Sequence, residues 1–328
     1  MRTPRRPDAP PAATPAPAAG ARPGALAGLD LRVRRLVRGR GTGLQTGSTL
    51  GPGSDPEEVA RYRPGEDDVR RIDWNVTARS GDTHVWRTRA DHELETWVLL
   101  DTSASMSFGT VEIDKAELAT GVGAAVGLLT DQPGNLTGVA RFTGADLRWG
   151  RPRTSRTAAA QLLSGRPERG RQRAEPAADL AAAIRLLDRR RRAPGLRVVV
   201  SDFLPPDGRT ERPFDWESPL RRLAARHDVL VAEVLDPREL TLPDVGALVL
   251  QDPESGARQE FWTSSRRLRE DYARLAAAHR KAIAAAVRGS GSAHVVLHTD
   301  RDWVRDLARH VTRRGRSAPT VPTPRRPT

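Results

Sequence analysis

The chain has 328 residues, enough for one large domain or two of modest size, and 38% of them are hydrophobic. It has no cysteine, which excludes a disulfide scaffold, a thiolate metal site and a cysteine nucleophile and favours a cytoplasmic protein. Nearly all of the net charge of +13 lies in residues 1–40, with nine arginines and two aspartates, and in residues 311–328, with five arginines and no acid. This distribution predicts no more than salt-sensitive binding of nucleic acid by arginine-rich tails.

The two ends of the chain differ in composition from its middle. No apolar run approaches the roughly 18 residues needed to span a bilayer, and the N-terminal segment lacks the continuous apolar stretch of a signal peptide. The Pro- and Ala-rich residues 1–27 and the basic residues 313–328 are predicted to be disordered. A short amphipathic helix is expected within residues 28–40. The sequence therefore predicts a soluble, intracellular protein with two basic tails.

Residues 61–94 change in character. They contain turn signals at Pro64-Gly65 and Ser80-Gly81-Asp82 and a strand-like alternation, THVWRTRA, at residues 83–90. We predict that residues 28–93 form the helix and a small β-rich subdomain. We interpret the charged run EDDVRRIDW at residues 66–74 as an ion-paired structural network with Trp74 as a packing anchor; the alternative is a catalytic acid cluster.

From residue 94 onward, apolar strand patterns alternate with amphipathic helix patterns. Strands are expected at residues 95–101, 135–143, 195–203, 228–236 and 293–299, a hairpin at 246–262, and helices at 113–130, 155–164, 178–192, 216–227, 264–288 and 301–313. Strands separated by helices require parallel crossovers. Residues 94–312 therefore predict an α/β domain with a doubly wound, mostly parallel sheet.

Polar side chains follow two of the predicted buried strands. Asp101 ends the apolar run VLLD, with Ser103 and Ser105 at the next alternate positions, and Asp202 ends the run VVVSD. Ligands bind at the carboxyl ends of such strands, and carboxylate and hydroxyl oxygens suit Mg²⁺ or a similar divalent cation. The sequence predicts a metal site of Asp101, Ser103, Ser105 and Asp202. The alternative is that these residues only cap the helix that follows.

The segment Asp-Thr-Ser-Ala-Ser at residues 101–105 resembles the metal-ion-dependent adhesion site of von Willebrand factor A domains. The stretch RYRPGEDDVRRIDWNVTARSGDTHVWR at residues 61–87 resembles the hallmark of the bacterial domain of unknown function fifty-eight family, which places it just ahead of an A-type domain. The resemblance covers residues 30–260. It implies a von Willebrand A-like fold, a short soluble type of member, and a MoxR-type AAA+ ATPase as partner.

The resemblance also implies which loops would hold the metal. The first loop of the family maps onto Asp101, Ser103 and Ser105, and its later aspartate loop maps onto Asp202. The middle loop usually supplies a threonine, where this chain has Ala178 in the segment PAADL. Because alanine has no side-chain oxygen, we expect water to replace that ligand and the affinity for the cation to fall.

These features together predict a non-enzymatic interaction or adaptor protein. It would hold a partner carboxylate on a divalent cation and work with a MoxR-type AAA+ ATPase in the assembly or maturation of other proteins. The sequence has no phosphate-binding Gly-x-x-x-x-Gly-Lys-Ser/Thr loop, no nucleophile elbow and no zinc-binding histidine motif. Two alternatives stay open: a nucleic-acid-associated protein acting through its arginine-rich tails, and a metal-dependent hydrolase using the Asp101 loop.

Overall fold

A computed structural model describes residues 56–62, 69–88, 95–111, 113–165, 173–190, 194–205, 208–251 and 257–317. The tail predicted at residues 1–27, the helix predicted within 28–40 and the acidic residues 66–68 lie outside these ranges, as do residues 318–328. The first five residues of the predicted basic tail, 313–317, are instead the end of the last helix.

The described residues before position 89 form one small unit. Strand β1 (Pro56–Arg61) pairs antiparallel with β2 (His84–Thr88), and between them in sequence lie a 3-10 turn η1 (Val69–Arg71) and helix α2 (Trp74–Ser80). The strand predicted in residues 83–90 is confirmed. The paired strands β1 and β2 agree with the predicted β-rich character, whereas helix α2 between them was not predicted. The small separate sheet that accompanies the α/β domain, β10–β11, lies C-terminal to its central strands.

Two residues of the charged run have roles that differ from the prediction. Asp73 begins α2 and its carboxylate accepts hydrogen bonds from the backbone N–H groups of Asn75 and Val76, so it is a helix cap. The Trp74 side chain is 70% exposed. It is therefore not the packing anchor that the sequence suggested.

The main sheet has eight strands in the order β12-β9-β8-β3-β4-β5-β7, with β6 paired to β4. Strands β12, β9, β8, β3 and β4 run parallel, and β5, β6 and β7 join antiparallel at one side. The predicted mostly parallel sheet is confirmed, whereas its antiparallel part was not predicted. The strands are β3 (Glu95–Asp101), β4 (Leu136–Phe142), β5 (Asp146–Trp149), β6 (Arg153–Thr154), β7 (Arg173–Pro176), β8 (Leu196–Ser201), β9 (Asp228–Leu235) and β12 (Ala293–His298).

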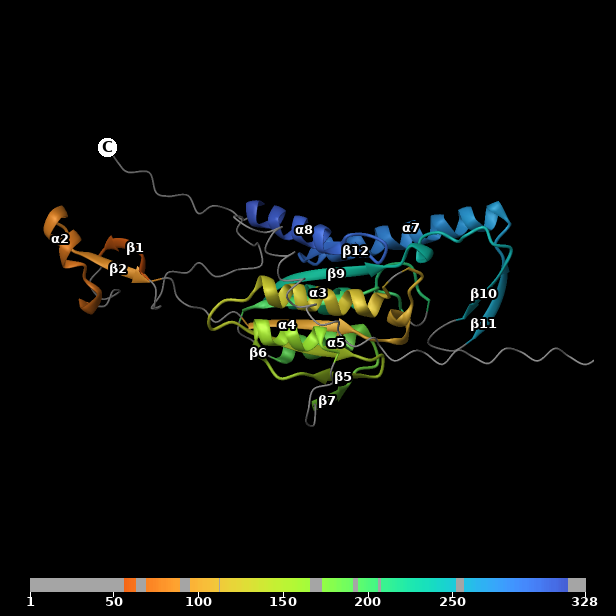
Figure 1. The fold of residues 1–328 in the computed structure, drawn as a ribbon, viewed down its shortest axis with the longest axis horizontal. Coiled ribbons are helices and arrows are strands. Elements are labelled where there is room, and N and C mark those ends of the chain that lie inside the picture. The colour runs from red at the N-terminus through yellow and green to blue at the C-terminus, as the bar shows by residue number, and fades with distance from the viewer. Residues whose placement is uncertain are drawn as a thin grey trace, which may run out of the picture.

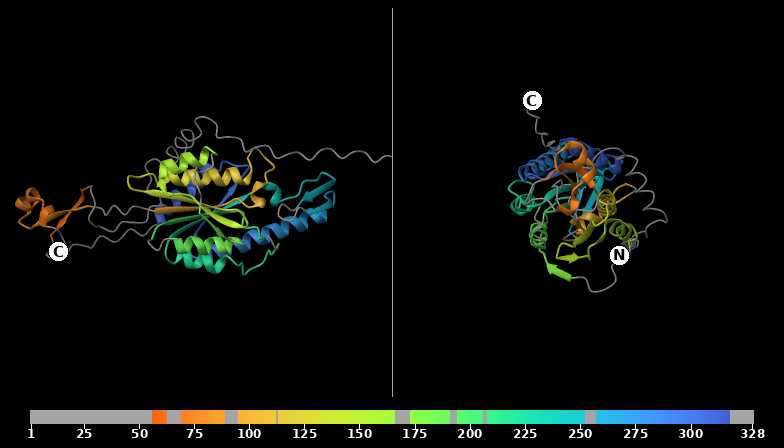
Figure 2. Two further views of the ribbon diagram at one scale, coloured as in Figure 1. Left: turned by 90° about the horizontal axis from the view of Figure 1, so that it is seen from below. Right: turned by 90° about the vertical axis from the view of Figure 1, so that its left-hand side faces the viewer.

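Helices cover both faces of this sheet, as Figure 2 shows. They are α3 (Lys115–Leu129), α4 (Ser155–Leu163), α5 (Leu180–Arg190), α6 (Glu217–Ala224), α7 (Arg266–Gly289) and α8 (Trp303–Ser317), with the 3-10 turns η2 (Ala104–Ser107) and η3 (Pro237–Glu239). The hairpin of β10 (Ala247–Gln251) and β11 (Arg258–Trp262) lies at the same end of the molecule as the start of α7 (Figure 1). Among the described helices, none is long and apolar enough to cross a membrane.

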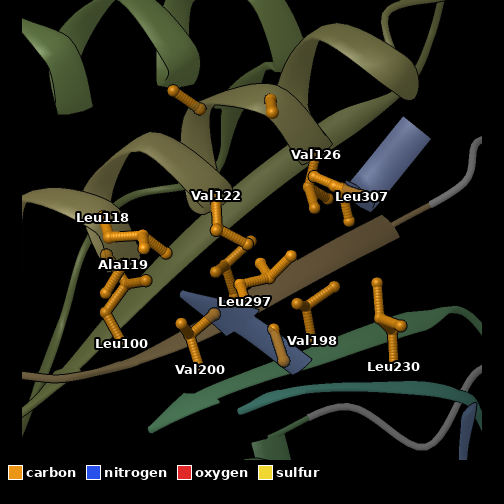
Figure 3. Close-up of a cluster of buried hydrophobic side chains, with 14 of the residues drawn as sticks. Leu100, Leu118, Ala119, Val122, Val126, Val198, Val200, Leu230, Leu297 and Leu307 are labelled. Carbon is orange, nitrogen blue, oxygen red and sulfur yellow. The ribbon is translucent and has the colours of Figure 1, made fainter. Parts of the chain in front are cut away.

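Strand β3 divides the interior into two cores. Val98 and Leu100 pack with α3, α4 and α8 on one face, and Trp97 and Leu99 pack with α5, α6 and α7 on the other. Figure 3 shows the first core, where side chains of α3 and α8 meet those of β3, β8, β9 and β12. All seven residues of β3 are buried. A parallel sheet covered on both faces requires such continuously apolar strands.

Glycines let α3 pack closely against its neighbours. A Cβ at Gly127 would lie 2.9 Å from the carbonyl oxygen of Ser155 in α4, and one at Gly121 would lie 2.7 Å from the ring of Trp303 in α8. The backbone of α3 therefore approaches both helices at a distance that no larger residue permits.

We predict that Gly138→Ala destabilises the domain. A Cβ at Gly138 in β4 would lie 2.6 Å from ring atoms of Trp97, which is 1% exposed and held by a hydrogen bond from its indole N–H to Glu95. The overpacked ring is expected to lower the free energy of unfolding by about 1–3 kcal/mol, measured by urea denaturation. Gly289→Ala is the control, since its Cβ would meet only Arg212 at 4.0 Å. Equal stability of the two variants would contradict the Trp97 contact.

Candidate functional site

The two aspartates that the sequence singled out lie at one edge of the sheet. Strands β3 and β8 are parallel neighbours, with Leu100 opposite Val200, so Asp101 and Asp202 both emerge at the C-terminal ends of adjacent strands. Their side chains are buried, at 4% and 1% exposure. The structure therefore brings together the ends of the two predicted loops.

Asp101 is the centre of a compact hydrogen-bond cluster. Its Oδ1 accepts from the N–H of Ser103 at 2.9 Å and from the hydroxyl of Ser103 at 2.6 Å, and its Oδ2 accepts from the hydroxyl of Ser201 at 2.6 Å. The Ser103 and Ser105 hydroxyl oxygens are 3.2 Å apart. Ser103 precedes η2, but its side chain makes no capping bond. Its hydroxyl is thus oriented toward Asp101 rather than toward the helix, unlike the capping alternative.

The environment of Asp101 changes its acidity. Burial first, and then repulsion from the Asp202 carboxylate, raise the pKa of Asp101 to about 6. Hydrogen bonds from Ser103 and Ser201 oppose this shift because they favour the charged carboxylate.

Asp202 is paired with a residue that the sequence analysis missed. Its Oδ2 accepts from the ammonium of Lys115 at 2.7 Å, and its Oδ1 accepts from the backbone N–H of Leu204 at 3.0 Å. Lys115 is 0% exposed and also donates to Glu239. Burial alone would lower the pKa of Lys115, but the two carboxylates outweigh it and raise that pKa. The available signal was that Lys115 is one of only two lysines in the chain.

A second set of charges holds the backbone at Asp202. Nη1 of Arg280 in α7 donates two hydrogen bonds, one to the carbonyl oxygen of Asp202 at 3.1 Å and one to the Glu233 carboxylate at 2.8 Å. Glu233, buried in β9, also lies 2.8 Å from Nε2 of His294 in β12. The segment after β8 is therefore anchored by its side chain to α3 and by its backbone to α7.

A cavity of about 290 Å³ opens beside Asp101. Asp101, Ser103 and Ser201 line it, and so does Ala178, the residue at the expected threonine position. Asp202 is not part of this lining. Most of the remaining wall is apolar or aromatic: Phe142, Leu180, Phe203, Leu204, Pro205, Phe214 and Trp216. The cavity thus combines the buried Asp101 carboxylate, two hydroxyls and the charged residues Asp179, Arg209 and Asp215 with an apolar and aromatic remainder.

The backbone turns sharply at Phe203, directly after Ser201 and Asp202. Phe203 adopts φ = 56°, a left-handed conformation that costs a bulky residue of order 1–3 kcal/mol. Its N–H donates to the Ser201 hydroxyl, and its buried ring packs edge-on against Trp216 with centroids 5.0 Å apart. This turn follows Ser201, which bonds Asp101, and Asp202, which bonds Lys115. The adjacent residues Ser201 and Asp202 therefore bond to different side chains, Ser201 to Asp101 and Asp202 to Lys115.

The donor set fits a divalent ion only in part. Asp101, Ser103 and Ser105 supply hard oxygens held together by hydrogen bonds, which suits a hydrated cation bound by one loop. Ala178 supplies no oxygen, and both carboxylate oxygens of Asp202 already accept hydrogen bonds. No group of three or more His, Cys, Asp or Glu residues able to hold a metal occurs in the part of the chain that the structure describes.

Comparisons with known proteins concern most of the chain. The family described as "Protein of unknown function DUF58" matches residues 58–282. Two relatives, "Uncharacterized protein Rv1480" of Mycobacterium tuberculosis and "Uncharacterized protein Mb1516" of Mycobacterium bovis, are each 45% identical over 294 residues, covering 90% of this chain and 90% of the relative. A solved structure, "conserved hypothetical protein BatB" from Bacteroides thetaiotaomicron, aligns at 15% identity with a TM-score of 0.41, covering 68% of this chain and 100% of its own.

Removing the partner of the buried lysine is expected to be costly. Asp202→Ala leaves the Lys115 ammonium buried with one carboxylate fewer and should lower the free energy of unfolding by about 3–5 kcal/mol, measured by chemical denaturation. The matched control is Glu270→Ala, which removes the carboxylate of an exposed pair with Arg266 and should change little. If both variants unfold at the same denaturant concentration, the Lys115–Asp202 pair does not hold the fold.

Proposed function

The chain belongs to the family described as "Protein of unknown function DUF58", and we propose that it is a non-enzymatic interaction protein that binds a partner at the C-terminal edge of its sheet. One observation carries this proposal: Asp101 and Ser103 line a cavity of about 290 Å³ whose walls are otherwise largely apolar. A recess that joins aromatic walls to a limited set of polar and charged groups is typical of a binding site.

The chemistry of the lining supports binding rather than catalysis. Among the described residues around the cavity, the ionisable side chains are Asp101, Asp179, Arg209 and Asp215. The cavity lining contains no histidine or lysine among its described residues, so the base within reach of the Ser103 and Ser201 hydroxyls is the Asp101 carboxylate, to which both donate. We assign that carboxylate to holding the ion rather than to activating a serine nucleophile.

We propose that Asp101, Ser103 and Ser105 hold a hydrated Mg²⁺ or similar ion weakly when it binds. The ion would supply an open coordination position for a glutamate or aspartate of the partner. Asp101 contributes the charge, the two hydroxyls contribute neutral oxygens, and water replaces the oxygen that Ala178 lacks. The hydrogen bond from Ser201 keeps the Asp101 carboxylate in place from the side of β8.

The proposed partner is a MoxR-type AAA+ ATPase, with this chain as its adaptor in the assembly or maturation of other proteins. The proposal rests on the resemblance of residues 61–87 and on the match to the family over residues 58–282. An adaptor needs a rigid binding edge, and the strands β3 and β8 that carry the site are buried along their full length.

Calorimetry with Mg²⁺ tests the metal-binding loop. We expect the parent protein to bind Mg²⁺ weakly and Asp101→Ala not to bind it. Ala178→Thr should bind Mg²⁺ more tightly, because it adds a hydroxyl to the cavity that Asp101 and Ser103 also line. Ala174→Thr, an exposed position in β7, is the matched control and should bind like the parent. Unchanged Mg²⁺ affinity in Asp101→Ala would show that the loop after β3 holds no metal.

A binding assay with the MoxR-type ATPase of the same organism tests the adaptor role. The double variant Ser103→Ala/Ser105→Ala should weaken the complex about tenfold or more, and EDTA should weaken the parent complex by a similar factor. Ser164→Ala, directly after α4, removes a hydroxyl that donates to the carbonyl oxygen of Gln161 in the preceding turn and is the control. A complex that tolerates both EDTA and the double variant would place the contact elsewhere on the molecule.

A further inference from the structure

Lys115 stands out in a chain that uses arginine for almost every positive charge. Of 54 lysines and arginines, only Lys115 and Lys281 are lysines. Lys281 lies on an exposed position of α7, whereas Lys115 is fully buried. An ammonium is a compact point charge, while a guanidinium is a wide planar fork. The buried position beside Asp202 and Glu239 is thus occupied by the more compact cation.

The local position of Lys115 is unfavourable by itself. It is the first residue of α3, directly after the cap Asp114, and the start of a helix carries partial positive charge. Removing an ammonium from water adds a further cost of several kcal/mol. The cost must be offset by groups that reach Lys115 from elsewhere in the chain.

Two carboxylates supply that compensation, and both are held in place. Asp202 is fixed by the N–H of Leu204 and by Arg280 on its carbonyl oxygen. Glu239 is fixed because its other oxygen accepts from the N–H of Asp236 at 3.0 Å, completing a capping box on η3. The carboxylates thus form a preorganised receptor for one cation, and Lys115 occupies it.

A divalent ion at Asp202 would have to compete with this ammonium. Displacing Lys115 would leave its charge buried beside the ion, with Glu239 as its remaining carboxylate partner among those it now contacts. Asp202 also lies outside the lining of the cavity through which an ion would reach Asp101. Both observations separate Asp202 from the loop of Asp101, Ser103 and Ser105.

We infer that the Lys115 ammonium occupies the position beside Asp202 that a metal ion would otherwise take. Asp202 is therefore a positioning residue and not a metal ligand. This inference deepens the proposed function, on which it rests for the identity of the site. It restricts metal binding to the loop after β3. The chain's own ammonium neutralises the second carboxylate permanently and ties α3, β8 and η3 together at the binding edge.

The first test uses the protein as it is. With ¹³C,¹⁵N-labelled lysine the chain gives only two sets of side-chain NMR signals, and comparison with Lys281→Arg assigns the one from Lys115. Saturating Mg²⁺ should leave the Lys115 ammonium signal in place, because its pair with Asp202 stays formed. A shift of this signal to the position seen in Asp202→Asn would mean that Mg²⁺ takes Asp202 from Lys115, and would overturn the inference.

Variants provide the second test. Lys115→Met should bind Mg²⁺ about tenfold more tightly than the parent or more, since Asp202 becomes available, and Lys115→Met/Asp202→Asn should lose this gain. Lys115→Met without a gain in affinity would contradict the inference, with near-UV circular dichroism reporting whether it is folded. If it does not fold, Asp202→Asn decides alone: unchanged Mg²⁺ affinity supports the inference, and lost binding overturns it.

The outcomes also separate this inference from the proposed metal-mediated docking. A parent protein that binds no Mg²⁺ contradicts that docking mode, yet Lys115→Met can still gain a site that depends on Asp202. Conversely, a parent that loses Mg²⁺ binding in Asp202→Asn keeps the docking mode and overturns the role of Lys115.

Discussion

A buried ammonium requires negative charge at a fixed place, and Lys115 imposes this requirement on three elements that are far apart in sequence. Asp202 follows β8 and Glu239 belongs to η3, while Lys115 itself begins α3. All three side chains lose most of their contact with water, so none of them can move without leaving another charge uncompensated. These ion pairs join α3, the end of β8 and η3 at the edge of the sheet that carries the candidate site.

The central elements could be predicted because their patterns are strong. Strands β3, β8 and β9 are centred on the apolar runs WVLL, VVV and VLVA, as expected of strands covered on both faces, and their positions agree with the sequence to within two residues at each end. The short strands β5, β6 and β7 were not predicted. They contain exposed charged residues such as Arg148 and Arg173, and they form through pairing with β4 and with one another rather than through a local apolar pattern.

Part of the candidate site could be predicted from the sequence. Asp101 and Ser103 lie together because they are neighbours on one loop, and Asp202 lies near them because adjacent parallel strands end at one edge. The contact of Lys115 with Asp202 joins residues 87 positions apart, and no local pattern encodes it. Trp74 was misjudged for the opposite reason. The sequence suggested that this aromatic residue packs in a core, but its position on α2 leaves it exposed.

The alternation along β3 has a consequence for how this segment can vary. Odd-numbered Trp97 and Leu99 and even-numbered Val98 and Leu100 belong to different cores. Replacing one aliphatic residue by another of similar volume disturbs one core locally. Inserting or deleting a single residue would exchange the two sets and turn the bulky indole toward the helix face that glycines have made narrow. In natural or engineered variants, residues 95–101 should therefore accept changes of side chain but keep their length.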